Sequence, residues 1–245
     1  MSKDARGWRS KFAVVAPSTN TIVQPDMDDF RVRGVTNHFG RIYIPNMKVK
    51  NDEEFVALVQ AIGATLYDAV DRCMTSEPDY LVMGMSALMF WDGRAASERR
   101  MQELSDHCGL QVSAGSFACE SALNLTGAKR IAVISPYFPV SDKNVTLFFQ
   151  DCGFEVVRFR GLKCSSPVAI AQVTEATLRT HIAEMDGDDV DAFVQVGTNL
   201  SMCELCTELE VEYGKPFVAI NAATYWHALR AMGIYDQFSG HGPLF

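Results

Sequence analysis

The sequence lacks the long apolar and basic segments that mark membrane and nucleic-acid-binding proteins. No segment approaches the ~18 uninterrupted apolar residues that a membrane helix requires. The formal net charge is -8, and no lysine or arginine run offers the clustered positive charge that binds phosphates. The basic segment 1–11 has no apolar core of a secretory signal. We therefore expect no membrane partner, no nucleic-acid partner and no secretion signal.

Motifs that hold nucleotides or metal ions are also missing. No expected strand is followed by a P-loop or by a complete dinucleotide glycine fingerprint, so we expect no cofactor. Cys203 and Cys206 form a single C-x-x-C on an expected helix without a second pair, which favours packing over metal binding. The five histidines lack ligand spacing: His38, His107, His181, His227 and His241. Seven cysteines, an odd number, fit reduced thiols in a cytoplasmic protein better than a disulfide framework.

The composition is that of a folded protein with a substantial core. Of the 245 residues, 48% are apolar and 10% aromatic, which excludes a disordered chain. The length suits one large domain or two fused domains of half that size.

Short β-branched runs alternate with helix-like stretches and fall into two sets of four. The first set is 12–16, 41–44, 80–83 and 111–113, and the second is 130–134, 154–159, 192–196 and 216–220. Counted from the first run of each set, the offsets are 29, 68 and 99 residues and then 24, 62 and 86 residues. Helical spacing of apolar residues predicts helices over 53–72, 171–185, 202–212 and 222–232. The repeated order favours an internal duplication, although any α/β protein shows similar spacing.

Strands that alternate with helices predict parallel sheets buried on both faces. We therefore expect an α/β fold of two pseudo-symmetric Rossmann-like (flavodoxin-like) halves, each with a four-stranded parallel sheet. The halves are expected at 1–115 and 116–221, with the C-terminal segment 222–245 packing back on the first half and an irregular tail at 239–243. Ligands of such sheets bind beyond the carboxyl ends of the strands, so the active site should lie in the cleft between the halves.

The loops after matching strands have similar chemistry in the two halves. The first strand of each set ends at 17–20 or 135–137, and the third ends at 84–87 or 197–200. These loops offer hydrogen-bond donors without charge: Asn20, Ser86, Tyr137, Thr198 and Asn199. Together with backbone N–H groups at helix starts, they would suit a small mono- or dicarboxylate or an enediolate. Each residue taken singly is also explained as an ordinary helix cap.

Several short motifs stand in a fixed order between about residues 7 and 234. They are Gly7-Trp8-Arg9, the segment 16–21, Ser135-Pro136-Tyr137, the segment 197–200, Glu210, the segment 213–216, Asn221-Ala222 and Trp226. In order and spacing they resemble the maleate cis-trans isomerase and arylmalonate decarboxylase group of the Asp/Glu racemase superfamily. The resemblance implies a cofactor-free enzyme. Because superfamily members are often dimers or larger, it leaves a homo-oligomer open.

The resemblance also implies a cysteine at the end of the third strand of each half. In the racemases and isomerases the two cysteines act on opposite faces of the substrate, and arylmalonate decarboxylases keep only the second, as proton donor. The matching positions here are Gly84 and Gly197, so both cysteines are missing. Two-base racemisation and isomerisation by thiolate addition are therefore not expected. Cys119, which lies beside another candidate loop, is better explained as a buried apolar side chain.

The candidate site residues follow from these loops and from the resemblance. Ser86 lies on a tight turn and either orients the substrate or attacks it; no adjacent base is evident, which favours orientation. Asn20 and Tyr137 match positions that bind a substrate carboxylate in the family. The candidate catalytic residues are Ser86, Tyr137 and Thr198. The candidate substrate-binding residues are Pro17, Ser18, Asn20, Gly84, Met85, Ala87, Ser116, Pro136, Ser165, Gly197 and Asn199.

The function predicted from the sequence is a cofactor-independent lyase or isomerase. It would act on a small carboxylic acid through an enediolate-type intermediate, in a site without cysteine. Two alternatives remain open: a hydrolase that uses Ser86 or an oriented water on a C–N or C–C bond, and a non-catalytic carboxylate-binding protein.

Overall fold

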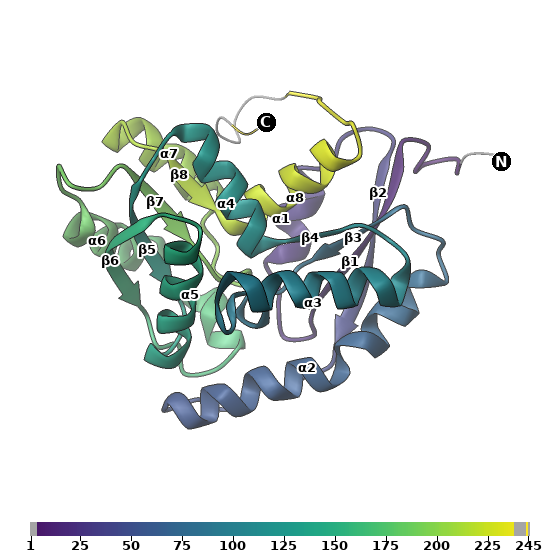
Figure 1. Ribbon diagram of the computed structural model, residues 1–245, viewed down its shortest axis with the longest axis horizontal. Helices are drawn as coiled ribbons and strands as arrows, with labels where there is room; N and C mark the ends of the chain where they lie inside the picture. The colour runs from purple at the N-terminus through teal and green to yellow at the C-terminus, as the bar shows by residue number, and fades with distance from the viewer. Residues whose placement is uncertain (1–3, 238–243, 245) are drawn as a thin grey trace.

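The computed structural model describes residues 4–237 and 244, which form two four-stranded parallel sheets (Figure 1). The first sheet contains β1 (Ser10–Pro17), β2 (Val35–Ile42), β3 (Tyr80–Met83) and β4 (Val112–Ala114), in the order β2-β1-β3-β4. The second contains β5 (Arg130–Ser135), β6 (Glu155–Gly161), β7 (Ala192–Gln195) and β8 (Phe217–Ala219), in the order β6-β5-β7-β8. The identical strand order confirms the predicted fold of two pseudo-symmetric α/β halves.

Helices cover the faces of the two sheets. Those of the first half are α1 (Val23–Asp29), α2 (Asp52–Met74), the 3-10 turn η1 (Ala87–Phe90), α3 (Gly93–Cys108) and α4 (Gly115–Thr126). Those that follow are α5 (Pro139–Asp151), the 3-10 turn η2 (Val168–Gln172), α6 (Glu175–Met185), α7 (Cys203–Tyr213) and α8 (Ile220–Ala231). The longest, α2, runs along the bottom of Figure 1 and contacts both β2 of its own half and α5 of the other. It begins where the Asn51 side chain accepts the Glu54 N–H at 2.9 Å.

Two predicted elements differ from the structure. The second strand was expected at 41–44, but β2 begins at Val35, because it is an edge strand whose half-buried polar residues hide the apolar pattern. The helix expected over 171–185 is split. Thr174 has an extended backbone and its hydroxyl accepts the Thr177 N–H at 3.3 Å, so α6 starts only at Glu175.

The C-terminal helix joins the two halves. Although α8 follows the last strand of the second sheet, it contacts α1, β3 and β4 of the first half and also packs on α4. The predicted boundary at 115/116 falls at the start of α4. The tail predicted at 239–243 lies outside the described residues. Over residues 4–237 and 244, no helix combines the length and apolarity needed to cross a membrane.

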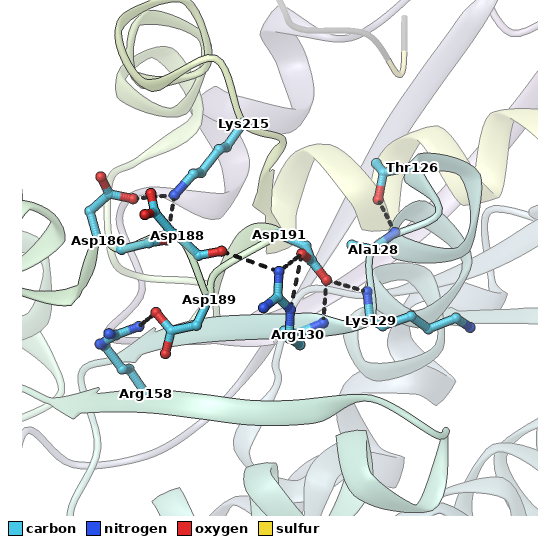
Figure 2. Close-up of polar contacts among 11 residues, drawn as sticks. Thr126, Ala128, Lys129, Arg130, Arg158, Asp186, Asp188, Asp189, Asp191 and Lys215 are labelled. Atoms are coloured by element: carbon cyan, nitrogen blue, oxygen red, sulfur yellow. Dashed lines mark hydrogen bonds and ion pairs between the residues drawn. The ribbon is translucent and has the colours of Figure 1, made fainter.

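Ion pairs close the amino ends of the second sheet (Figure 2). Asp191, which precedes β7, accepts the backbone N–H groups of Lys129 and Arg130 at 3.1 and 2.8 Å, and the Arg130 guanidinium lies 2.7 Å away. Beside it, Arg158 pairs with Asp189 at 2.7 Å. Open parallel sheets bind ligands at the opposite, carboxyl ends of their strands.

Candidate functional site

A cavity lies between the loops at the carboxyl ends of the two sheets. Its polar lining residues come from both halves: Thr19 and Asn20 after β1, Ser86 after β3, Tyr137 after β5, and Thr198 and Asn199 after β7. Its other lining residues are apolar or glycine: Pro17, Ile44, Phe55, Leu58, Val59, Ile62, Met85, Ala87, Pro167, Ile170 and Gly197. Among the described residues, no charged side chain lines the cavity.

Two buried hydroxyl groups face each other across the two halves. The Ser86 Oγ and the Tyr137 hydroxyl are 2.5 Å apart, and the two residues are only 2% and 4% exposed. The Phe55 ring packs 5.4 Å from the Tyr137 ring and holds it in place. Burial raises the pKa of Tyr137, against the opposing effect of the Ser86 hydrogen bond, so the phenol keeps its proton at neutral pH. The pair has two protons and shares one, which leaves one proton for a ligand.

A second contact between the halves joins Asn20 and Thr198. The Asn20 Nδ2 donates to the Thr198 Oγ1 at 3.0 Å, and the Thr198 hydroxyl donates to the Gly84 carbonyl at 3.0 Å. The Asn20 Oδ1 accepts the N–H groups of Ile22 and Val23 at the start of α1. The sequence placed Thr198 among the catalytic groups. In the structure its one proton already has an acceptor, so it has none to give to a ligand.

Two further amides hold the loop after β7. The Asn199 Oδ1 accepts the Thr21 N–H at 2.9 Å, and its Nδ2 donates to the Pro167 carbonyl at 2.9 Å. Behind the loop, the Asn221 Nδ2 donates to the Thr198 carbonyl at 2.9 Å. Because both ends of the Asn199 amide are hydrogen-bonded, this side chain fixes the cavity wall.

Several residues that line the cavity have backbone N–H groups without an acceptor among the described residues. Within the described part of the chain, the N–H groups of Ser86, Ala87, Thr198 and Asn199 donate no hydrogen bond. They belong to lining residues from both halves. Unpaired N–H groups of successive residues bind anions well, so this surface fits a carboxylate although it carries no charged side chain.

The apolar wall of the cavity comes mainly from α2. Phe55, Leu58, Val59 and Ile62 line it. The helical spacing of these residues was visible in the sequence, but it predicts only a buried face, and a helix that packs on a core has the same pattern. No sequence signal separated this wall from the rest of the core.

The remaining sequence candidates divide into two groups. Pro17, Met85, Ala87 and Gly197 line the cavity as expected. Five others do not line it. The Ser18 hydroxyl bonds to the Ile44 backbone, Ser116 lies 3.2 Å from Ser97 inside the core, Ser165 is exposed, and Pro136 packs against Gly197. Gly84 contributes only its carbonyl, which accepts the Thr198 hydroxyl.

None of the seven cysteines, all of which lie in the described part of the chain, lines the cavity. Cys119 is fully buried, and burial raises the pKa of its thiol. The Cys203 thiol donates to the Asp26 Oδ2 at 3.2 Å. No cluster of three or more His, Cys, Asp or Glu side chains suited to a metal ion occurs within residues 4–237 and 244.

The strand register gives the correspondence between the loops of the two halves. The Gly84 N–H donates to the Val15 carbonyl at 2.8 Å, and the Val196 N–H donates to the Ile134 carbonyl at 3.0 Å. Gly84 is therefore equivalent to Val196, not to Gly197 as the sequence predicted, and Ser86 is equivalent to Thr198. Cysteine occupies none of these positions.

The backbone at Gly197 itself requires glycine. Its φ is +104°, and an added Cβ would lie 2.5 Å from the Pro136 Cδ. A side chain of any kind is excluded there unless the loop moves. A thiol could not be placed at this position in the observed conformation.

Comparison with known proteins identifies the family to which this architecture belongs. The sequence model of the arylmalonate decarboxylase family matches residues 60–245, and the chain belongs to this family. A maleate isomerase of Pseudomonas putida is 28% identical over an alignment that covers 94% of this chain and 94% of its own. The family and this relative make the chain an enzyme of isomerase or lyase type.

Solved structures share the fold at lower sequence identity. A maleate cis-trans isomerase of Nocardia farcinica, in a form with a covalently bound succinylcysteine intermediate, matches with a TM-score of 0.86 and 18% identity over 96% of this chain and 97% of its own. A structure of arylmalonate decarboxylase matches with a TM-score of 0.73 and 18% identity over 96% and 98%.

Proposed function

We propose that the protein is a cofactor-independent decarboxylase of a malonate-type acid that carries an apolar substituent. The observation that carries the proposal is the buried Ser86–Tyr137 hydroxyl pair, with one proton to spare, in a cavity that no cysteine lines. Ser86 and Tyr137 would serve as acid and orienting group. Asn20, Thr198 and Asn199 would fix the two walls of the site.

The chemistry needs an electron sink and an acid. As the C–C bond breaks, CO2 leaves and its bonding electrons pass to the remaining carboxylate, which becomes an enediolate. The unpaired N–H groups of the lining residues would stabilise that charge. A proton from the Ser86–Tyr137 pair would then form the new C–H bond, and solvent would return a proton to the phenolate. Because burial raises the pKa of Tyr137, this proton is in place throughout the neutral range.

Isomerisation of maleate is less well supported. The structure of the Nocardia farcinica relative contains a covalently bound succinylcysteine intermediate, in which a cysteine is bonded to a succinyl group. No cysteine lines the cavity of the present chain. A hydrolase is also not favoured, because the only partner of the Ser86 Oγ within the described residues is a phenol that keeps its proton, not a base.

The α2 wall supports an apolar substituent. Four of its side chains line the cavity, and apolar contact of this extent is gained only when a ligand presents apolar surface. A malonate with an aryl or branched alkyl group presents such a surface, whereas maleate does not.

The test is a substrate panel of phenylmalonate, methylmalonate and maleate in D2O. We expect CO2 release from phenylmalonate, slower release from methylmalonate, and one deuterium in each product. Conversion of maleate to fumarate without CO2 release would overturn the proposal in favour of an isomerase. Tight binding of phenylmalonate without any turnover would overturn it in favour of a binding protein.

A further inference from the structure

A partly buried arginine lies directly behind the polar wall of the cavity. Arg41 is near the end of β2, where it pairs with Ala16 of β1. Its Nη1 donates to the Asn20 carbonyl at 2.9 Å and its Nη2 donates to the Gln24 Oε1 at 2.6 Å. The guanidinium also lies over the Phe39 ring, 5.5 Å from its centre. Arg41 is thus hydrogen-bonded directly to Asn20, a residue that lines the cavity.

Arg41 has no carboxylate partner in the described part of the chain. No Asp or Glu oxygen lies within ion-pair distance of its guanidinium, whereas Arg130, Arg158 and Arg179 all form ion pairs at the surface. Burial lowers the pKa of Arg41, and no acidic side chain opposes that effect. The group nevertheless stays charged, because arginine does not lose its proton in proteins.

An uncompensated charge in a half-buried position has an energetic cost. The chain has a net charge of -8, so acidic residues were available in number to neutralise Arg41. None is placed there. A bound anion in the adjacent cavity would offset the cost through Coulombic attraction, which is stronger in a partly dry environment than in bulk water.

We propose that Arg41 is a positioning residue that holds Asn20 through its carbonyl and supplies the positive potential by which the uncharged cavity selects dianionic carboxylates. The substrate class is then a dicarboxylate that enters with both carboxyl groups ionised. This inference rests on the proposed function, because it assumes that the ligand is a carboxylate. It adds a residue that does not touch the ligand and a preference for charge over shape.

The experiment compares binding of phenylmalonate, a dianion, and phenylacetate, a monoanion of similar shape, to the full-length protein at low and high salt. In the Arg41→Gln variant we expect phenylmalonate to bind about tenfold more weakly at low salt, with a smaller loss for phenylacetate. We also expect the salt dependence of phenylmalonate binding to flatten. A purely structural role would weaken both ligands equally and would leave the salt dependence unchanged.

Two further variants make the outcome decisive. Arg41→Lys keeps the charge and should retain most of the salt dependence, and it serves as the test if the Gln variant does not fold. Arg158→Gln removes a charge that is paired with Asp189 at the far end of the second sheet, and it should bind like the wild type. Unchanged affinity and salt dependence in folded Arg41→Gln would overturn this inference alone. A wild type that binds neither probe would overturn the proposed function together with it.

Discussion

The two halves of the molecule make two similar contacts with each other, and only one of these contacts has a hydroxyl proton left for a ligand. The loop after β3 sends Ser86 to Tyr137 of the second half, and the equivalent position after β7 sends Thr198 to Asn20 of the first half. Each contact joins the third-strand loop of one half to the first-strand loop of the other. The two halves are therefore joined across one cavity by two contacts, the Ser86–Tyr137 clamp and the Asn20–Thr198 clamp.

The difference lies in what the partner residue contributes. Tyr137 adds a second hydroxyl, so one proton remains for a ligand. Asn20 adds an amide donor, and the Thr198 proton goes to the Gly84 carbonyl, so this contact has no hydroxyl proton left for a ligand. Under the proposed function, the pseudo-symmetric scaffold thus has an acid on one side only. A one-sided acid suits a lyase that protonates one face and does not suit a racemase, which needs a proton carrier on each face.

The largest effect on catalysis should come from removing the Tyr137 hydroxyl from the Ser86–Tyr137 clamp. Tyr137→Phe deletes the phenol and keeps the ring that packs on Phe55. We expect kcat for phenylmalonate decarboxylation to fall by about 10²–10⁴-fold, the usual loss when a general acid is removed, with little change in ligand affinity. Steady-state CO2 release and direct binding measurements separate the two quantities.

Thr198→Ser is the matched control in the Asn20–Thr198 clamp. It keeps the hydroxyl that bonds to Gly84 and Asn20, so kcat should stay within a fewfold of the wild type. If Tyr137→Phe decarboxylates as fast as this control, the Tyr137 hydroxyl is not the acid.

The glycines at the two strand ends should respond unequally to the same substitution. In Gly197→Ala the new Cβ meets Pro136 at 2.5 Å with φ at +104°, so we expect a loss of about 3 kcal/mol in the free energy of unfolding. In Gly84→Ala the nearest atoms are 3.1 Å away and φ is not in the left-handed region, so we expect about 1 kcal/mol. Chemical unfolding of both variants measures the difference. Equal losses would mean that the loop after β7 adjusts freely.

The hydrogen bonds of the Asn20–Thr198 clamp should contribute to the free energy of unfolding. Thr198→Val keeps the shape but leaves the Asn20 Nδ2 and the Gly84 carbonyl without their partner. Because both groups are buried between the halves, we expect a loss of about 1–3 kcal/mol in the free energy of unfolding. Denaturant unfolding tests this, with Thr198→Ser expected to recover most of the loss. Unaltered stability in the Val variant would show that water replaces the hydroxyl.

Much of the fold could be predicted because the core strands are locally unambiguous. The run at 80–83 coincides with β3, a fully buried central strand of continuous apolar residues. The run at 41–44 missed most of β2, since this edge strand carries the half-buried polar residues Thr36, Asn37 and His38 in its first half. A strand that is buried on both faces is a continuous apolar run in the sequence, and partial exposure weakens that pattern.

The site was predictable to the extent that it consists of loops at strand ends. Asn20, Ser86 and Tyr137 line the cavity because parallel strands place their carboxyl ends together. The cavity wall from α2 and the unpaired charge of Arg41 depend on tertiary packing, and nothing in the local sequence separates them from core and surface. The same holds for Thr198, whose proton is assigned only when the Gly84 carbonyl is seen beside it.

The smallest effect should appear at the opposite ends of the sheets, where the halves also differ. Asp79 and Asp191 occupy equivalent positions, since each donates its backbone N–H to the first-strand carbonyl of Lys11 or Arg130 at 2.8 Å. The Asp79 carboxylate accepts the Lys11 N–H at 2.8 Å, and the Asp191 carboxylate binds the Arg130 guanidinium in addition to two N–H groups. We expect Asp191→Asn to cost about 1 kcal/mol more than Asp79→Asn.

The pH dependence of that difference follows from the charge. The Arg130 side chain, helped by backbone N–H groups, holds the pKa of Asp191 well below its usual range. A lowered carboxyl pKa contributes stability that is fully present above the unfolded value of about 3.9 and is lost as the pH falls through the folded value. Acid titrations of unfolding should therefore show a shallower loss below about pH 4 in Asp191→Asn than in Asp79→Asn or the wild type. If the acid limb is the same in all three, the Arg130 pair contributes nothing beyond the hydrogen bonds that both halves share.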